Sequence, residues 1–194
     1  MGKLIGIFGA AGSGKDTVAQ FLIENHGYTK VSFAKTIKDI ASIAFGWDRE
    51  LLEGITKESR AWRETHDEYW GLTPRSALQK IGNEMFKGHI SDDFWIKKTR
   101  RDIETSEKPV VITDCRFRVE YDFIKSMGGT VVYLNRDTVE NEHLKKLASE
   151  GNLESLRDSG VHPSEWEFYT MTPDLVIHNN EGLEALHSVL AVGI

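Results

Sequence analysis

The sequence predicts an α/β fold in which helices cover a parallel β-sheet. Five short apolar segments have the composition of strands, and they occupy residues 4–8, 30–33, 109–113, 130–134 and 174–178. Helical patterns lie between these segments. Because strands and helices alternate along the chain, we expect the strands to run parallel in one sheet.

The first strand and the first helix can be read directly from residues 4–23. Residues 4–8, "LIGIF", form an apolar run that suits a strand buried on both faces. From Lys15 onward, Val18, Phe21 and Leu22 recur at helical spacing. The loop between strand and helix therefore ends at a helix N-terminus, where backbone N–H groups and the helix dipole favour an anion.

That loop, "GAAGSGKDT", fits the phosphate-binding pattern of a glycine-rich turn followed by lysine. Gly9, Gly12 and Gly14 permit backbone conformations in which successive amides point at one anion, and Lys15 adds a mobile positive charge. The alternative is a tight strand-to-helix turn that holds no ligand. We expect the loop to bind phosphates through Gly9, Ala11, Gly12, Ser13, Gly14, Lys15, Asp16 and Thr17.

The loop departs from the pattern at its last position. Asp16 stands where Ser or Thr normally contacts magnesium, and the hydroxyl follows one residue later at Thr17. A second carboxylate, Asp114, ends the strand-like segment 109–113, where P-loop enzymes place the group that orients magnesium through water. Capping of the next turn is the alternative for Asp114. The loop resembles that of small-molecule P-loop kinases, and this resemblance implies no direct metal ligand but magnesium held through water near Asp16, Thr17 and Asp114. Direct coordination by Asp16 stays open.

Composition restricts the class of protein and the kind of ligand that the chain can have. With 194 residues, 40% of them hydrophobic, the chain fits one domain with a real core. The formal net charge of −6 argues against broad binding to nucleic acid or to an anionic membrane, so we expect a small ligand. One cysteine excludes an internal disulfide, and the histidines lack zinc-ligand spacing. Without a signal peptide or a membrane-spanning stretch, we expect a cytoplasmic protein.

The strand-like segments are unevenly spaced. About 75 residues separate the second from the third, and about 40 separate the fourth from the fifth. Both intervals exceed an ordinary crossover, so each is predicted to carry an inserted functional lobe. Ligands of such sheets bind outside the carboxyl ends of the strands.

The first long interval contains a second cluster of chemistry-bearing residues. Thr73 and Pro74 predict a helix start, and Arg75, Gln79 and Gly82 follow at spacings that share one helix face. Guanidinium and aromatic groups suit a phosphate and a stacked base. The alternative is that the tryptophans are core and the arginines a solvated face. The further members of the cluster are Arg60, Arg63, Trp62, Trp70 and Trp95.

These residues carry a resemblance to a known family. In chain order, "GAAGSGKDT", "FAKTIKD", "RAWRE", "TPRSALQKIGNEMF", "DFWIKK", "TDCRF", "GGTVVYLNR", "HPSE" and "IHNNEGLEAL" together resemble the bacteriophage-type deoxynucleoside monophosphate kinases of the P-loop superfamily. The resemblance implies a single three-layer domain over residues 1–194 with a five-stranded parallel sheet. It further implies a monophosphate-binding lobe at about 35–108 and a lid at about 136–173.

The resemblance also implies an activity, the ATP-dependent phosphorylation of deoxynucleoside monophosphates to diphosphates in nucleotide metabolism. ATP and Mg²⁺ would be the cofactors, in a host cytoplasm if the source is a bacteriophage. A homodimer, the preferred base and the strength of the deoxyribose preference stay open. Two alternatives are a different P-loop small-molecule kinase, such as a dephospho-coenzyme A kinase-like enzyme, and a nucleotide-binding module without transferase activity.

Residue roles follow from the same resemblance. Lys15 would bridge the donor phosphates, and Asn179 would lie in the adenine-contacting loop. His162 either contacts phosphate or caps the turn of Ser164. The implied catalytic residues are Lys15, Asp114, Arg116 and Arg136. The implied acceptor-binding residues are Lys38, Arg60, Arg63 and Arg75 for the phosphate, with Gln79 and Trp95 for the base and for sugar selection.

Overall fold

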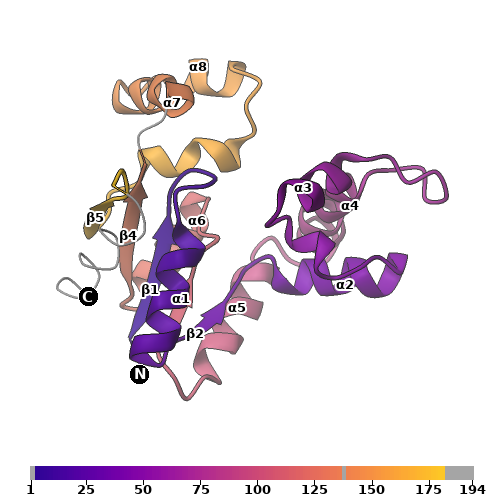
Figure 1. Cartoon of the computed structure of the whole chain (residues 1–194), viewed down its shortest axis with the longest axis horizontal. Helices are drawn as coiled ribbons and strands as arrows, with labels where there is room; N and C mark the ends of the chain where they lie inside the picture. The colour runs from indigo at the N-terminus through magenta and orange to yellow at the C-terminus, as the bar shows by residue number, and fades with distance from the viewer. Residues whose placement is uncertain (1–2, 137–138, 182–194) are drawn as a thin grey trace. The chain divides into compact units, whose positions relative to one another are not determined.

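A computed structural model describes residues 3–136 and 139–181 (Figure 1). The chain divides into two compact units. The first comprises Met1–Val31 and Asp102–Ile194, and the second comprises Ser32–Arg101. The last residues of the segment "IHNNEGLEAL" and two residues of the predicted lid lie outside the described residues.

The first unit is built on a five-stranded sheet with the strand order β2-β3-β1-β4-β5. All four neighbouring pairs run parallel, as the alternation of strands and helices predicts. The apolar β1 is buried along its whole length, because it has a neighbour on each edge and helices on each face. The strands are β1 (Leu4–Phe8), β2 (Thr29–Val31), β3 (Val110–Ile112), β4 (Thr130–Asn135) and β5 (Leu175–His178).

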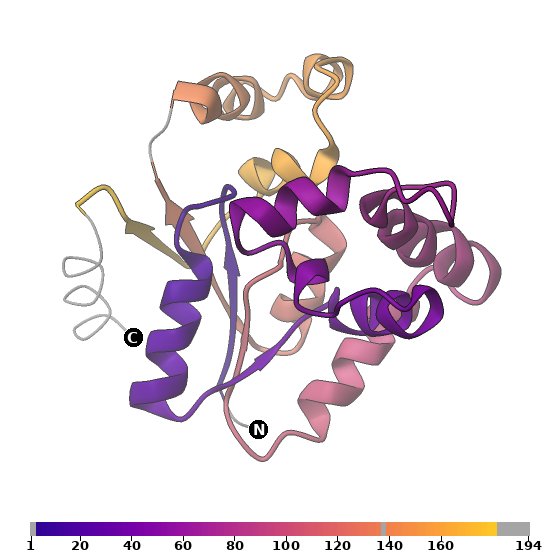
Figure 2. The ribbon, with the colours of Figure 1, turned by 45° about the vertical axis from the view of Figure 1, so that its right-hand side comes forward.

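Helices lie on both faces of this sheet, so the first unit has three layers. Successive residues of a strand face opposite sides. Ile5 and Ile7 share a buried cluster with Val18 and Leu22 of α1 (Lys15–His26). A Cβ on Gly6 between them would instead run into Ile124 of α6 (Arg118–Ser126). Figure 2 shows α1 running along the strands of the sheet.

The remaining helices of the first unit follow β4 in the chain. Leu144, Leu156 and Trp166 form a separate small apolar cluster among them. The interval between β4 and β5 therefore has a core of its own. It contains α7 (Val139–Ser149), α8 (Leu153–Asp158) and the 3₁₀ turns η3 (Pro163–Glu165) and η4 (Glu167–Thr170).

The second unit is helical and has its own core. Its buried apolar cluster is formed by side chains spread along residues 32–101, namely Ala41, Trp47, Leu52, Ala77, Ile81 and Trp95. Its elements are α2 (Lys35–Phe45), the 3₁₀ turn η1 (Leu51–Glu53), α3 (Lys57–Glu64), α4 (Pro74–Gln79), the π-helix η2 (Lys80–Lys87) and most of α5 (Phe94–Glu104).

Two expectations about local structure need correction. The second strand was expected at residues 30–33 but comprises Thr29–Val31, because the chain turns into α2 after Val31, with Lys35 N–H donating to Ser32 O. The predicted shared face of Arg75, Gln79 and Gly82 does not extend to Gly82. The α-helix gives way to a π-helix after Gln79, and Gly82 is buried while Gln79 is exposed.

The start of α4 agrees with its prediction. Thr73 is the N-cap, and its hydroxyl accepts a hydrogen bond from Ser76 N–H at 3.1 Å, with Pro74 in the first turn. The helices in the described part of the chain include none that is long and apolar enough to cross a membrane.

Candidate active site

The glycine-rich loop closes around the ammonium of Lys15. Lys15 Nζ donates to Gly9 O at 2.8 Å and to Ala10 O at 2.6 Å. Gly9 has a φ of +149°, and a Cβ there would lie 3.3 Å from the carbonyl carbon of Leu134 and closer still to its oxygen. Only glycine therefore lets the loop pass this close to β4.

The protonated form of Lys15 is destabilised by its surroundings. Burial is the largest influence and, with the nearby positive charge of Arg116, lowers the pKa of Lys15 from about 10.5 to about 8. The negative charges of Asp16 and Glu165 act in the opposite direction but are weaker. A phosphate bound in this loop would restore the charged form, because an anion favours the ammonium.

Asp16 is already engaged by protein groups. Its carboxylate accepts from Lys30 Nζ at 2.7 Å and from Thr113 Oγ1 at 3.0 Å. Burial acts to raise the pKa of Asp16, but the bonds from Lys30 and Thr113 and the charge of Lys15 outweigh it and lower the pKa. Asp114 directly follows Thr113, so both carboxylates belong to the same edge of the sheet, beside the phosphate loop.

Arg116 forms hydrogen bonds with Glu165, which lies between β4 and β5, and with Glu120 of α6. Its NH1 donates to Glu165 Oε1 at 2.7 Å, and its backbone N–H donates to Glu120 Oε2 at 2.7 Å. Glu165 belongs to the "HPSE" segment, where His162 caps η3 by accepting from Ser164 N–H at 3.3 Å. The capping role of His162 is thus confirmed. Its neighbour Glu165 is the residue that connects this segment to the loop after β3.

Arg136 and Asn179 both bind the backbone of the phosphate loop. Arg136 NH1 donates to Gly12 O at 3.0 Å, and Asn179 Nδ2 donates to Ser13 O at 2.8 Å. Both residues follow the carboxyl ends of their strands, β4 and β5. Arg136 and Asn179 therefore both support the backbone of the phosphate loop.

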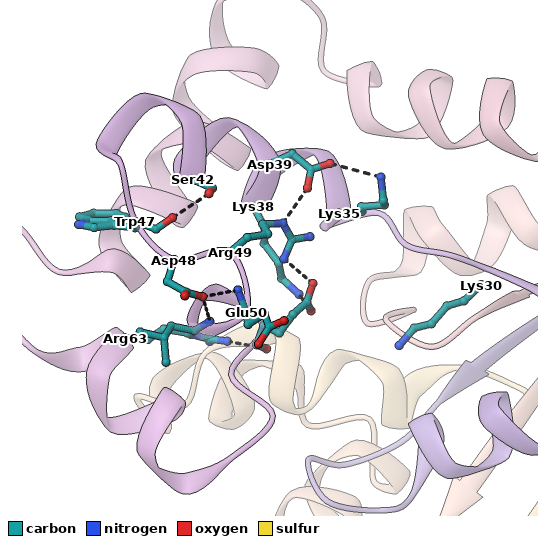
Figure 3. Close-up of polar contacts among 12 residues, drawn as sticks. Lys30, Lys35, Lys38, Asp39, Ser42, Trp47, Asp48, Arg49, Glu50 and Arg63 are labelled. Atoms are coloured by element: carbon teal, nitrogen blue, oxygen red, sulfur yellow. Dashed lines mark hydrogen bonds and ion pairs between the residues drawn. The ribbon is translucent and has the colours of Figure 1, made fainter.

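In the second unit, a carboxylate network holds Lys38 (Figure 3). Lys38 Nζ donates to Glu53 Oε2 at 2.5 Å, and Arg49 NH1 donates to Glu53 Oε1 at 2.5 Å. Arg49 Nε also donates to Asp39 Oδ1 at 2.7 Å. Burial acts to raise the pKa of Glu53, but Lys38 and Arg49 outweigh it and lower the pKa.

Arg60 and Arg63 belong to α3, and both donate to backbone carbonyls of residues 53–55, the 53–55 loop. Arg60 donates from Nε to Gly54 O and from NH2 to Ile55 O, both at 3.0 Å. Arg63 NH1 donates to Glu53 O at 3.3 Å (Figure 3). Backbone carbonyls therefore orient both guanidinium groups.

The other three candidates of the second unit differ in exposure. Arg75 is partly exposed, with its Nε 3.4 Å from Glu64 Oε1, and Gln79 is exposed. Trp95 is only 5% exposed, and its Nε1 donates to Gly82 O at 2.7 Å. The indole of Trp95 is packed in the core and its N–H is hydrogen-bonded. Little of its surface is therefore accessible for the predicted contact with a substrate.

Comparison with known proteins decides the family. A sequence profile described as deoxynucleotide monophosphate kinase matches residues 51–190. The chain belongs to the deoxynucleotide monophosphate kinase family. It is a nucleotide kinase with an α/β fold, and the match does not favour the dephospho-coenzyme A kinase-like alternative.

Two curated relatives come from viruses. A putative deoxynucleotide monophosphate kinase of Acanthamoeba polyphaga mimivirus is 29% identical over an alignment of 199 residues. The alignment covers 95% of this chain and 92% of the relative. The deoxynucleoside-5'-monophosphate kinase of Escherichia phage T5 is 26% identical over 181 residues, covering 64% and 72%. Among solved structures, TT1252 from Thermus thermophilus matches with a TM-score of 0.50 at 19% identity, over 100% of this chain and 98% of that chain, and supports the fold.

Some residues that organise this kinase's candidate site were not singled out from the sequence. Glu165 and Glu53 each hold a cationic candidate, and Arg49 shares Glu53 with Lys38. "HPSE" was a visible signal for Glu165. Arg49 and Glu53 are four residues apart and form an ion pair, but no local pattern indicates their other partners, Asp39 and Lys38, which come from α2.

Cys115 is a free cysteine in the core of the protein. Cys115 is buried, and burial together with the nearby carboxylates raises the pKa of its thiol well above the ordinary value, as expected for a packed side chain. Within residues 3–136 and 139–181, no three His, Cys, Asp or Glu side chains are grouped so that they could hold a metal ion.

Proposed function

We propose that this kinase transfers the γ-phosphoryl group of ATP to the phosphate of a deoxynucleoside monophosphate. The main support is the Lys15 ammonium, which is held on loop carbonyls at the start of α1 and withdrawn from water, in a chain that belongs to a family of nucleotide kinases. Phosphoryl transfer depends on positioning and on charge stabilisation, which this loop is suited to supply.

The donor phosphates are proposed to lie along the backbone of residues 9–17. Lys15 Nζ would exchange its carbonyl partners for phosphate oxygens and stabilise the negative charge of the group in transfer. Bound Mg²⁺ would neutralise charge on the β- and γ-phosphate oxygens. Asp16, Thr17 and Asp114 would hold its water ligands, because carboxylate and hydroxyl oxygens suit this cation.

Arg116 and Arg136 are proposed to face the transferring phosphate. Among the described residues, the Arg116 guanidinium donates to Glu165 Oε1 and the Arg136 guanidinium to Gly12 O. A guanidinium has further N–H groups, so each arginine can keep that bond and still donate to phosphate. Asn179, which supports Ser13 O, is proposed to act on ATP through the shape of the loop as well as by contact with adenine.

The acceptor phosphate is proposed to bind Arg60, Arg63 and Arg75, with Lys38 as a weaker contributor. Arg60 and Arg63 are oriented by carbonyls, whereas Lys38 shares Glu53 with Arg49. The exposed Gln79 is proposed to read the base. We further propose that residues 35–108 serve as the acceptor lobe and residues 136–173 as the lid.

A substrate panel tests the proposal. Purified enzyme with ATP and Mg²⁺ is assayed for nucleoside diphosphate formation from paired substrates, for example dGMP with GMP and dTMP with UMP. We expect kcat/KM to favour the deoxy member by up to about 100-fold, because a pocket wall rejects an added hydroxyl only weakly. Equal use of ribose and deoxyribose partners would contradict the deoxynucleotide assignment, and no transfer to any monophosphate would contradict the acceptor class.

A further inference from the structure

The 53–55 loop holds two arginines by its carbonyl oxygens. Arg60 binds the carbonyls of Gly54 and Ile55, and Arg63 NH1 binds the carbonyl of Glu53. This loop closes the turn η1, where Gly54 is the C-cap. The position of the Arg63 guanidinium therefore depends on the shape of this loop.

Gly54 leaves the space that the Arg63 side chain occupies. A Cβ built on Gly54 would lie 2.8 Å from Cζ of Arg63 and closer still to its NH1. Carbon atoms do not approach this closely, so any side chain at position 54 must displace the guanidinium. Because that group is the end of a flexible side chain, it can swing away while the backbone stays in place.

The second unit contains a matched glycine without such a neighbour. Gly54 has a φ of +67°, and Gly46, the C-cap of α2, has a φ of +70°. Both positions disfavour a residue with a Cβ to a similar degree. A Cβ on Gly46, however, would meet no atom within 4 Å. The two glycines thus share the backbone constraint and differ in the guanidinium beside Gly54.

We propose that Gly54 is a positioning residue for the acceptor phosphate, because its missing side chain lets Arg63 lie against the Glu53 carbonyl. The ligand that Arg63 would receive is a phosphate monoester, which a planar guanidinium can bind through two parallel hydrogen bonds. This inference rests on the proposed acceptor role of Arg63. Gly54 acts only through Arg63 and touches no substrate itself.

The test compares Gly54→Ala with Gly46→Ala. Both variants should lose similar thermal stability, since both place alanine in the left-handed region. Gly54→Ala should raise the KM for the acceptor roughly fivefold or more beyond Gly46→Ala, with the KM for ATP unchanged. Equal acceptor KM values for the two variants would overturn the positioning role.

A second pair keeps the test informative if alanine prevents folding. Asparagine tolerates positive φ better than alanine does, so Gly54→Asn and Gly46→Asn carry the same contrast with less backbone strain. The same excess of acceptor KM is expected for Gly54→Asn. Its absence would again overturn the role of Gly54.

Arg63→Ala separates failure of this inference from failure of the proposed function. In the Arg63→Ala background, Gly54→Ala should raise the acceptor KM no further than Gly46→Ala does, because the displaced group is gone. A persisting excess would show that Gly54 acts by another route and overturn the inference. If Arg63→Ala leaves the acceptor KM at the wild-type value, the acceptor assignment of Arg63 itself is wrong.

Discussion

The phosphate loop of the first unit and the 53–55 loop of the second use the same device with different cations. In each, backbone carbonyls hold a basic side chain, Lys15 in the first and Arg60 in the second. Lys15 is partly buried and its pKa falls to about 8, whereas Arg60 is exposed. Lysine can lose its proton on burial, while a guanidinium stays charged wherever it lies.

The two regions also differ in how their charge is balanced. Among the described residues, Lys15 Nζ donates only to uncharged oxygens. In the second unit, Lys38 and Arg49 share the carboxylate of Glu53, and Arg49 also binds Asp39. The phosphate loop therefore keeps the positive charge of Lys15 available for an anion, while part of the charge in the second unit is neutralised within the protein.

The largest expected effect is on the stability of the second unit. Trp95→Ala removes a buried indole and leaves the Gly82 carbonyl without its donor, so we expect a loss of about 3–5 kcal/mol in the free energy of unfolding. Urea denaturation measures it. Trp70→Ala is the control, since Trp70 is 39% exposed and should cost clearly less.

Trp95→Phe then asks whether Trp95 also selects the sugar. Phenylalanine keeps much of the packing, so a folded variant can be assayed. An unchanged dGMP to GMP ratio of kcat/KM would leave Trp95 with a packing role only. Equal destabilisation by Trp95→Ala and Trp70→Ala would contradict the core position of Trp95.

Lys15→Ala tests the uncompensated charge of the phosphate loop. We expect kcat to fall by about 100- to 1,000-fold with the fold intact, because the ammonium matters chiefly when charge develops on the phosphate. Activity and circular dichroism measure the two effects. Lys97→Ala, which removes an exposed lysine paired with Asp93, should leave kcat unchanged. A Lys15→Ala variant that keeps more than about a tenth of wild-type kcat would refute the phosphate-loop assignment.

Arg75→Ala tests the acceptor side of the comparison. We expect the acceptor KM to rise, or turnover to fall, by about 10- to 100-fold with little change in the KM for ATP, as for loss of a charged hydrogen bond. Glu64→Gln is the control, because it removes the ion-pair partner of Arg75 and keeps the guanidinium. If Glu64→Gln reproduces the effect, Arg75 acts through that ion pair. Equal weakening of both substrates would indicate a folding role.

The smallest expected effect is on the pH profile. Because the pKa of Lys15 is about 8 in the free enzyme, kcat/KM for ATP should fall about fivefold between pH 8 and pH 9 as the ammonium deprotonates. The limb in kcat should lie at higher pH, since bound phosphate restores the charge. Coincident limbs in both profiles would show that Lys15 does not contact the phosphates.

The lowered pKa of Lys15 also makes the stability of the folded chain depend on pH. Between about pH 8 and pH 10.5 the unfolded chain binds the Lys15 proton and the folded chain has lost it, so the free energy of unfolding rises with pH. Below pH 8 the penalty of burying the ammonium is fully present. Unfolding of wild type and Lys15→Met across this window measures the difference, and parallel pH curves would contradict the lowered pKa.

The sequence alone determined the sheet and the phosphate loop, because both depend on short segments. The apolar run of β1, the glycines and Lys15 lie within the first 15 residues, and their order is enough to predict a strand, an anion loop and a helix. The end of β2 was predicted two residues too late, since a turn at Ser32 competes with the strand there. Local patterns specify which element forms more sharply than where it ends.

Which acidic residue pairs with which basic residue depends on the tertiary structure. Sequence reasoning proposed Lys38 and Arg116 for phosphate but could not pair them with Glu53 and Glu165, which lie 15 and 49 positions away. It could also not choose between the core and the ligand for Trp95, because an indole in an amphipathic helix suits both. Burial, charge pairing and the space beside a glycine arise from segments that meet only after folding, so no local spacing records them.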